Sequence, residues 1–286
     1  MQACRYATCR TQPVMTLAWN RYGKSRVRLV KVARRRPSHD LIDLTIDVQL
    51  EGGFAPVYNG DNALCVATDT MKNTVYAFAR RFAIDYVEAF LSRLADHFVE
   101  KTAVTAARLT AVEQPWTRLS DHAFVQPGRE HWTCVVTRDQ EGTTTVSGLS
   151  DLIVLKTTDS AFSGFPRDAY TTLPETEDRI LATAVTASWT YRTGFADFEV
   201  RRSIRAALVD TFAGHHSRSV QHTLKAMAEA ALEACPDVSE ITLSLPNRHH
   251  LLVDLKPFGL DNPNEVFVAT EQPYGLIEAT FCRSQR

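Results

Sequence analysis

The alternation of hydrophobic and polar residues is clearest between Leu41 and Leu50, where every second side chain is apolar. Successive side chains of an extended strand point to opposite sides, so the apolar set shares one face. That set is Ile42, Leu44, Ile46, Val48 and Leu50, with Asp43, Thr45, Asp47 and Gln49 between them. A period of two with one polar face predicts a half-buried antiparallel strand.

A second long alternation lies between Ile180 and Tyr191. It predicts a strand with one face made of Leu181, Thr183, Val185, Ala187, Trp189 and Tyr191. Further strand-like runs predict strands at residues 26–32, 102–113, 131–138, 143–157, 238–245, 250–255 and 265–270.

Helical spacing of apolar residues predicts four helices, at residues 71–81, 82–100, 197–211 and 217–235. In the second helix an aromatic stripe predicts the face that packs on a sheet: Phe82, Tyr86, Phe90, Leu94 and Phe98, with Val87 and Leu91 beside them. The last helix has an apolar stripe made of Val220, Leu224, Met227, Ala228, Ala231 and Leu232.

The order strand, strand, helix, helix, strand, strand occurs twice along the chain. This order predicts an α+β fold of two tandem domains, at residues 18–141 and 142–286, each an antiparallel sheet with a helix pair on one face. The duplication follows from the order of elements and not from a residue-level repeat. Residues 1–17 are mixed and polar and are expected to form a disordered extension.

Composition places the chain among ordinary globular proteins and limits its partners. It has 286 residues, of which 44% are hydrophobic and 23% charged, and a net charge of −1. This length allows a sizeable core. The near-neutral charge gives no reason to expect nucleic acid or an anionic membrane as a partner.

The six cysteines contain no C-x-x-C pair and follow no secretion-like apolar segment. This pattern predicts reduced thiols in a reducing compartment. Cysteine and histidine spacings do not match a zinc site, and the glycine-rich loops that bind dinucleotides or ATP are missing from the sequence. We therefore expect neither a metal nor an organic cofactor.

The stretch from Val66 to Thr74 has the composition of a strand tip that leads into a helix. Thr68, Asp69 and Thr70 can cap the first turn of that helix with their side-chain oxygens. The same turn, with its free N–H groups and helix dipole, can bind an anion. Capping is the commoner role for such residues, and the stretch alone does not decide between the two.

Three motifs together resemble the uricase (urate oxidase) family. They are Val66-Ala67-Thr68-Asp69-Thr70-Met71-Lys72-Asn73-Thr74, Arg21-Tyr22-Gly23-Lys24 and Ser244-Leu245-Pro246-Asn247-Arg248-His249, and the likeness extends from about Asn20 to Arg283. The resemblance implies two tunnelling-fold domains. It also implies that two subunits close their sheets into a barrel and that two barrels stack into a homotetramer around a tunnel. The polar strand faces fit a tunnel wall and fit plain solvent exposure equally well.

The resemblance implies a proton-transfer group made of Lys24, Thr68 and His249. A lysine acts as a general base only when burial or nearby cations lower its pKa, and a threonine hydroxyl can relay a proton. Asn247 matches a residue near the place where oxygen and water lie above the urate ring. Taken alone, Lys24 fits a surface lysine, and His249 fits a structural histidine near a strand end.

The resemblance also implies a substrate clamp. Arg179 and Gln221 match residues that hold the edge of urate, a flat anion for which a planar fork of donors and an amide are suited. Phe162 matches a phenylalanine that stacks on the purine. Apolar neighbours of the ring are matched by Leu173 and Val220, whereas Thr68 and Asp69 match residues contributed by the other subunit. By composition alone, Arg179 fits a surface ion pair equally well.

The implied reaction is oxidation of urate by molecular oxygen, without a cofactor, to 5-hydroxyisourate and hydrogen peroxide. The chain ends Cys282-Arg283-Ser284-Gln285-Arg286 and lacks the Ser-Lys-Leu peroxisomal signal, so a bacterial-type cytoplasmic enzyme is expected. Two alternatives stay open: another tunnelling-fold enzyme that acts on a pterin or purine, such as a cyclohydrolase, and an inactive purine-binding homologue. The first usually requires a zinc site, and the second would be favoured by replacement of Lys24, Thr68 or His249.

Overall fold

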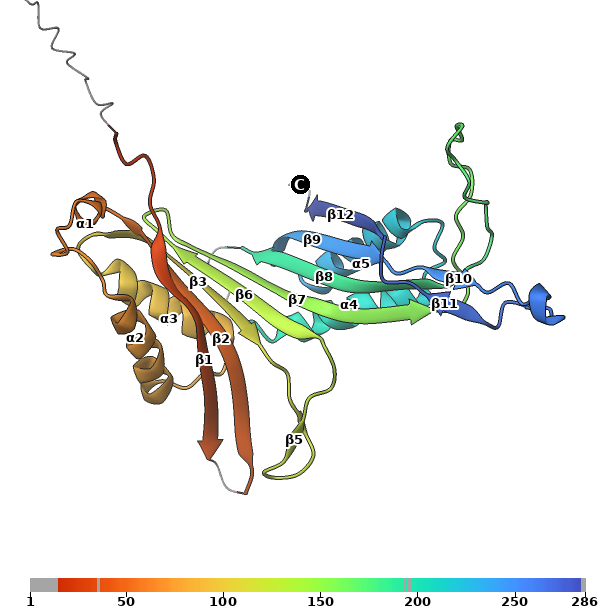
Figure 1. The fold of residues 1–286 in the computed structure, drawn as a ribbon. Coiled ribbons are helices and arrows are strands. Elements are labelled where there is room, and N and C mark those ends of the chain that lie inside the picture. The colour runs from red at the N-terminus through yellow and green to blue at the C-terminus, as the bar shows by residue number, and fades with distance from the viewer. Residues whose placement is uncertain (1–14, 35–36, 193, 195–196, 284–286) are drawn as a thin grey trace, which may run out of the picture.

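One eight-stranded antiparallel sheet runs through the whole molecule (Figure 1). The structure is a computed structural model that describes residues 15–34, 37–192, 194 and 197–283. The strand order is β1-β2-β3-β6-β7-β8-β9-β12. The strands are β1 (Tyr22–Arg34), β2 (His39–Gly52), β3 (Val104–Glu113), β6 (His131–Arg138), β7 (Thr143–Lys156), β8 (Leu181–Tyr191), β9 (Val238–Asn247) and β12 (Gly275–Cys282).

Two helix pairs cover one face of this sheet (Figure 1). In the first half of the chain, α2 packs on β1, and α3 packs on β3 and β6; in the second half, α4 packs on β7, and α5 packs on β9 and β12. The helices are α2 (Thr68–Arg81), α3 (Val87–Val99), α4 (Val200–Gly214) and α5 (Val220–Ala234). Smaller elements are α1 (Ala55–Tyr58), the 3₁₀ turn η1 (Lys256–Phe258) and the two-stranded ribbons β4 (Thr117–Arg118) with β5 (Phe124–Val125) and β10 (His250–Leu252) with β11 (Phe267–Ala269).

The periodicities of the sequence predict the two hydrophobic cores well. Four residues of β2 are completely buried beneath α2 and α3, namely Leu44, Ile46, Val48 and Leu50. The predicted face of β8 is also buried, Thr183 included, and so are Val220, Leu224, Met227, Ala228 and Ala231 of α5. The α+β fold class is therefore confirmed.

Ion pairs join the second half of the molecule to the first. Arg201 of α4 lies 2.8 Å from a carboxylate oxygen of Glu113 at the end of β3. Arg205, one turn later, donates two hydrogen bonds to the carboxylate of Glu130, at 2.6 and 2.7 Å. These contacts, together with the continuous sheet, tie the two halves together. The domain boundary at residues 141/142 falls in the turn before β7 and stays a prediction.

Several predicted boundaries are wrong. The helix predicted from Phe82 begins only at Val87, because Phe82 adopts an extended conformation and ends α2. Phe82 and Tyr86 keep their helical spacing in sequence but pack elsewhere, Phe82 on Phe78 and Tyr86 on Phe198. A regular spacing can therefore continue across a break between two helices.

The end of the sheet also differs from the prediction. The run at residues 250–255 does not close the sheet; only His250–Leu252 is a strand, and it pairs with β11 in a separate ribbon. The edge strand is β12, which pairs with β9 and was not predicted. Its inward residues Ile277, Ala279 and Phe281 are only partly buried, and the apolar signal along the sequence is correspondingly weak.

The predicted disordered extension at residues 1–17 lies mostly outside the described residues. Residues 15–17 are exposed and belong to no helix or strand. No helix in the described part of the chain is long and apolar enough to cross a membrane.

Candidate active site

The residues expected at the site lie in two separate groups at opposite ends of the chain's sheet (Figure 1). Lys24, Thr68 and Asp69 belong to β1 and the start of α2, in the first half. The others lie in the second half, on β9, on α5 and on the segments before β8 and β10: Phe162, Leu173, Arg179, Val220, Gln221, Asn247 and His249.

Lys24 lies within β1, opposite Val48 of β2, and not before the strand as predicted. A β-bulge follows it: the pairing register shifts between Lys24 and Val27, and Arg26 has a positive φ of 57°. The N–H of Arg26 donates to Asp47 at 2.5 Å. Bulges redirect side chains and are frequent beside functional sites. Lys24 is thus a half-buried cation on a locally distorted edge strand.

The start of α2 has no side-chain cap. Ala67 is the N-cap residue, and Thr68, Asp69 and Thr70 form the first turn, so the capping role that their composition favoured is wrong. The Asp69 carboxylate instead accepts hydrogen bonds from Lys72 at 2.5 Å and Asn73 at 2.8 Å. The bond to Lys72 holds the pKa of Asp69 below its usual range, and Lys24 acts in the same direction through its charge. Lys24 and the first turn of α2 therefore share one electrostatic environment, and that turn keeps N–H groups available to an anion.

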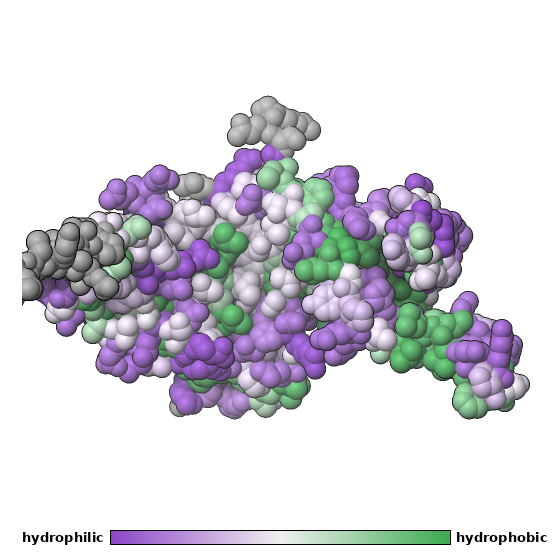
Figure 2. All heavy atoms as spheres, turned by 45° about the horizontal axis from the view of Figure 1, so that its top comes forward, coloured by the Kyte–Doolittle hydropathy of each residue, from purple (hydrophilic) through white to green (hydrophobic). Residues whose placement is uncertain are grey.

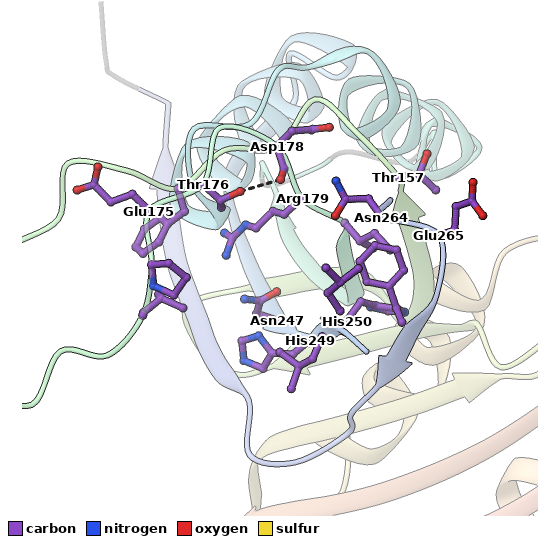
Figure 3. A pocket seen from close by; sticks show the side chains of 17 residues that line it. Thr157, Glu175, Thr176, Asp178, Arg179, Asn247, His249, His250, Asn264 and Glu265 are labelled. Atoms are coloured by element: carbon purple, nitrogen blue, oxygen red, sulfur yellow. Dashed lines mark hydrogen bonds between the residues drawn. The ribbon is translucent and has the colours of Figure 1, made fainter. Parts of the chain in front are cut away.

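A cavity of about 610 Å³ contains most of the second group (Figure 3). It is formed by the segment before β8, the end of β9 and the β10–β11 ribbon. Five of the expected residues line it: Phe162, Leu173, Arg179, Asn247 and His249. Figure 3 shows Arg179 on one side of the cavity and Asn247 and His249 facing it.

Arg179 is a half-buried cation for which no counter-charge is found among the described residues. Its Nε is buried and has no hydrogen-bond partner, and no ion pair is found for its guanidinium within the described ranges. Burial lowers the pKa of Arg179. Asp178, its neighbour in sequence, instead accepts a hydrogen bond from Thr158 at 2.8 Å. Because a partly buried charge whose Nε has no hydrogen-bond partner is unfavourable, this guanidinium is suited to an anionic ligand in the cavity.

Backbone hydrogen bonds on two sides fix the position of Phe162 and its neighbour Ala161. Phe162 exchanges backbone hydrogen bonds with Thr176, at 2.8 and 3.1 Å, and the preceding Ala161 donates to the carbonyl of Ser217 at 2.7 Å. The guanidinium carbon of Arg179 lies 5.1 Å from the centre of the Phe162 ring, within cation–π range. Phe162 and Arg179 together form a wall with one aromatic surface and one planar cation, which fits a flat anion.

Backbone contacts fix Asn247 and His249 on both sides. Asn247 ends β9, opposite Gly275 of β12 and Thr183 of β8. The carbonyl of His249 accepts a hydrogen bond from the N–H of Thr270 at 2.9 Å. His250, the first residue of β10, also lines the cavity, and His249 lies just before that strand. No hydrogen bond joins the two imidazoles.

Val220 and Gln221 do not line this cavity. Val220 is buried in the second core, and Gln221 is exposed on the first turn of α5. Backbone contacts between Ser217 and residues 159–161 hold this turn beside the segment that leads to Phe162. The predicted clamp of Arg179 and Gln221 is therefore not formed within the cavity lining.

The sequence did not identify several polar residues of the cavity. His250, Thr176, Asn264 and Glu265 all line it. Thr176, Asn264 and Glu265 lie in loops without a periodic pattern, so only the chain path brings them there. Within the described ranges no cluster of three or more His, Cys, Asp or Glu side chains could hold a metal ion. The expectation of chemistry without a metal or cofactor stays a prediction.

Comparison with known proteins gives one consistent result. A family model described as Uricase matches residues 20–137 and 145–278. The chain is 50% identical over 275 residues to a uricase of Arthrobacter globiformis, covering 94% of this chain and 90% of that protein. It is 39% identical over 281 residues to a uricase of Dictyostelium discoideum, covering 94% and 98%.

Solved structures agree with these sequence matches. The crystal structure of the uricase from Arthrobacter globiformis matches with a TM-score of 0.92 at 49% identity, over 96% of both chains. A uricase from Bacillus fastidious matches with a TM-score of 0.80 over 92% of this chain and 93% of that one. Its identity of 24% supports the fold alone.

Proposed function

The chain belongs to the uricase family, and from that premise we propose which of its residues oxidise urate and how the active site is completed. Uricases oxidise urate with molecular oxygen; urate, oxygen and water give 5-hydroxyisourate and hydrogen peroxide. The observation that supports the site most strongly is the unpaired guanidinium of Arg179 beside the ring of Phe162. Together they offer charge, planar donors and a stacking surface to a flat purine anion.

Within this site, Arg179 binds the urate edge and Phe162 stacks on its ring. Leu173 is an exposed apolar residue on the rim of the cavity and covers part of the purine. Gln221 extends the clamp from the exposed first turn of α5, and Val220 supports this turn from the second core. The purine is thereby oriented before the reaction, which lowers the entropic part of the barrier.

Lys24, Thr68 and His249 move the protons. In its neutral amine form, Lys24 accepts a proton from urate through the hydroxyl of Thr68, and His249 completes the relay from the opposite side. Asn247, beside His249 at the end of β9, lies near the position of oxygen and water. Removing a proton makes the purine electron-rich, so that it reduces oxygen and forms a peroxide adduct. Hydrogen peroxide leaves from this adduct, and water then adds to the oxidised purine to give 5-hydroxyisourate. Proton transfer by positioned groups contributes a factor of about 10²–10⁴ to such rates.

These three residues belong to the two groups that lie at opposite ends of one chain's sheet (Figure 1). We therefore propose that each active site combines Lys24, Thr68 and Asp69 of one subunit with the cavity of another. Both edge strands, β1 and β12, are paired on one side only within the described sheet. Open edges favour association with another sheet, and the family architecture closes them into a barrel.

Exposed apolar residues support assembly at the same end as the cavity. The β10–β11 ribbon and its tip expose Leu251, Leu252, Phe258, Leu260, Val266 and Val268. Figure 2 shows apolar surface toward the end of the molecule that carries this ribbon. Contiguous apolar surface of this kind indicates a protein–protein contact. We propose a homotetramer with its sites between subunits, to be tested by sedimentation. The free thiols of Cys65, Cys134, Cys235 and Cys282 support a cytoplasmic location.

The function is tested by aerobic urate consumption with purified, EDTA-treated protein, following loss of urate absorbance and formation of hydrogen peroxide together. Consumption of urate with matching peroxide supports cofactor-free oxidation. Urate that is bound and not consumed would indicate a purine-binding homologue. Absence of both binding and turnover would favour the pterin alternative.

A further inference from the structure

The hydroxyl of Tyr22 makes two hydrogen bonds with the backbone of one residue, Val66. It accepts from the N–H of Val66 at 2.8 Å and donates to its carbonyl at 3.1 Å. Its ring packs edge-on against the fully buried Phe54, with 4.8 Å between ring centres. One side chain of β1 thus holds a residue that lies 44 positions later in the chain.

These two bonds, together with a hydrogen bond between the Tyr22 hydroxyl and the Cys65 thiol, are the long-range attachment of the segment before α2. From residue 57 to residue 67 the other hydrogen bonds are local: Asn59, Gly60 and Asp61 bond within the turn after α1, and Cys65 bonds to Asn62. Val57 and Val66 add apolar contacts with the hydrophobic core of the first half of the chain. Such contacts hold the segment against the core but do not fix its direction, because the hydrophobic effect is non-directional. Without Tyr22, the position of this segment along β1 would have no directional contact to fix it.

Only the N-cap residue Ala67 separates Val66 from the first turn of α2, which has no side-chain cap. Thr68 is two residues beyond the clamped peptide, and Lys24 is two residues beyond Tyr22 on β1. Side chains two apart on a strand share a face. The helix α2 packs on β1, and the charge of Lys24 is the smallest of the named causes that shift the pKa of Asp69. Tyr22 therefore fixes Thr68 and Asp69 relative to Lys24.

We propose that Tyr22 is a positioning residue for urate oxidation, whose hydroxyl holds the first turn of α2 beside Lys24. This inference rests on the roles of Lys24 and Thr68 proposed above. Tyr22 does not need to touch urate; it sets the distance across which the lysine and the threonine exchange a proton. A displacement of about 1 Å in such a contact can reduce a rate about 100-fold.

The hydroxyl keeps its proton near neutral pH. Burial and, second, a hydrogen bond with the Cys65 thiol raise the pKa of Tyr22 to about 12. It can thus donate and accept at the same time near neutral pH. Tyr22→Phe would remove both bonds to Val66 and keep the ring that packs on Phe54.

Tyr76→Phe is the matched control. The Tyr76 hydroxyl of α2 donates to the carbonyl of Arg28 at 3.2 Å, which is another hydrogen bond between α2 and β1. It lies two helical turns beyond Thr68 and leaves the start of the helix untouched. Both variants are compared with the wild type in kcat, in KM for urate and in thermal unfolding.

We expect Tyr22→Phe to lower kcat about 10- to 100-fold with a smaller change in KM, while Tyr76→Phe keeps the wild-type kcat. In a Thr68→Ala background, Tyr22→Phe should cause little further loss, because contributions that act through one residue are not additive. Three results would overturn the proposal. The first is a wild-type kcat in Tyr22→Phe, and the second is a full multiplicative loss of kcat in the double variant. The third is that both tyrosine variants lose kcat and unfolding temperature equally.

The same series separates this inference from the proposed function. If Lys24→Met and Thr68→Ala leave turnover unchanged, the proposed proton relay is wrong. If they abolish turnover and Tyr22→Phe does not change it, the relay stands and the positioning role of Tyr22 is wrong.

Discussion

A β-carbon added at Gly23 would lie 1.8 Å from the carbonyl oxygen of Val48, so β1 and β2 meet there more closely than any other residue allows. Gly23 stands between Tyr22, which holds the start of α2, and Lys24. The glycine of this motif is required for steric reasons, and the close approach of the strands sets the position of both neighbours.

Gly23→Ala should therefore push β1 away from β2 and displace Lys24. We expect a loss of about 1–3 kcal/mol in the free energy of unfolding, as for other overpacked sites, and a large loss of turnover. Urea unfolding and urate consumption measure the two effects. Gly53→Ala is the control, since no atom lies within 4 Å of its added β-carbon. Equal behaviour of the two variants would contradict the steric argument.

Lys24→Met should reduce urate turnover about 10²- to 10⁴-fold, the usual contribution of a general base. Binding of urate should persist, because Arg179 and Phe162 belong to the other group. Single-turnover kinetics and equilibrium binding of urate without oxygen separate the two effects. Lys31→Met, on the same strand, is the control; Lys31 donates to the carbonyl of Phe82 and is expected to keep the wild-type kcat. Unchanged turnover in Lys24→Met would exclude this lysine as the base.

Arg179→Ala should raise the KM for urate by a factor of about 10 to 100, which corresponds to the roughly 1.5–3 kcal/mol of a hydrogen bond to a charged group. No acidic side chain among the described residues pairs with its guanidinium, so the loss falls on the ligand. Arg179→Lys should restore only part of the affinity, because an ammonium group lacks the planar fork. Steady-state kinetics provide the comparison, and a wild-type KM in the alanine variant would place the anion site elsewhere.

The stability of the protein should fall as the solution is made acidic, in part because of His215. Burial, and then the charges of His222, Lys156 and His216, lower the pKa of His215. The folded protein therefore takes up this proton less readily than the unfolded chain. The unfavourable contribution of His215 to the free energy of unfolding begins as the pH falls below the unfolded pKa of about 6.5. It becomes complete once the pH falls below the pKa of His215 in the folded protein.

His215→Gln should make the decrease in unfolding temperature shallower between about pH 7.5 and pH 5. Some of the decrease should remain, since the pKa values of His39 and His97 are also lowered. Scanning calorimetry at several pH values measures the slope. The same slope in wild type and variant would show that His215 does not contribute.

The sequence predicted those parts of the fold that depend on local periodicity. Alternation in β2 and β8 and the stripe of α5 identified buried faces correctly, since a buried face requires a repeating apolar position. The break between α2 and α3 was missed because Phe82 and Tyr86 continue the spacing while packing on Phe78 and Phe198. The edge strand β12 was missed because an edge strand buries little.

The candidate site could be predicted only in part from the sequence, for a different reason. The resemblance to the family predicted Lys24, Arg179 and His249, yet no local pattern shows that Lys24 and His249 lie at opposite ends of the sheet. That separation follows from the strand order, a long-range property. The contact between Tyr22 and Val66 is likewise long-range, and the N-capping composition of Thr68 and Asp69 pointed to a local role that the structure does not have.

The division of the active site between two subunits is tested most directly by complementation. Lys24→Met and Arg179→Ala chains carry different affinity tags, are produced together, and mixed oligomers are purified through both tags. Each variant alone should have little activity at low urate concentration. In a randomly mixed oligomer, about one site in four should combine an intact Lys24 with an intact Arg179 from different chains.

The control mixes Lys24→Met with Thr68→Ala, two changes in the same group, and should recover nothing. Recovery of about a quarter of the wild-type activity in the first mixture alone is the result that we predict. No recovery in the first mixture would contradict the account and place all the site residues within one chain.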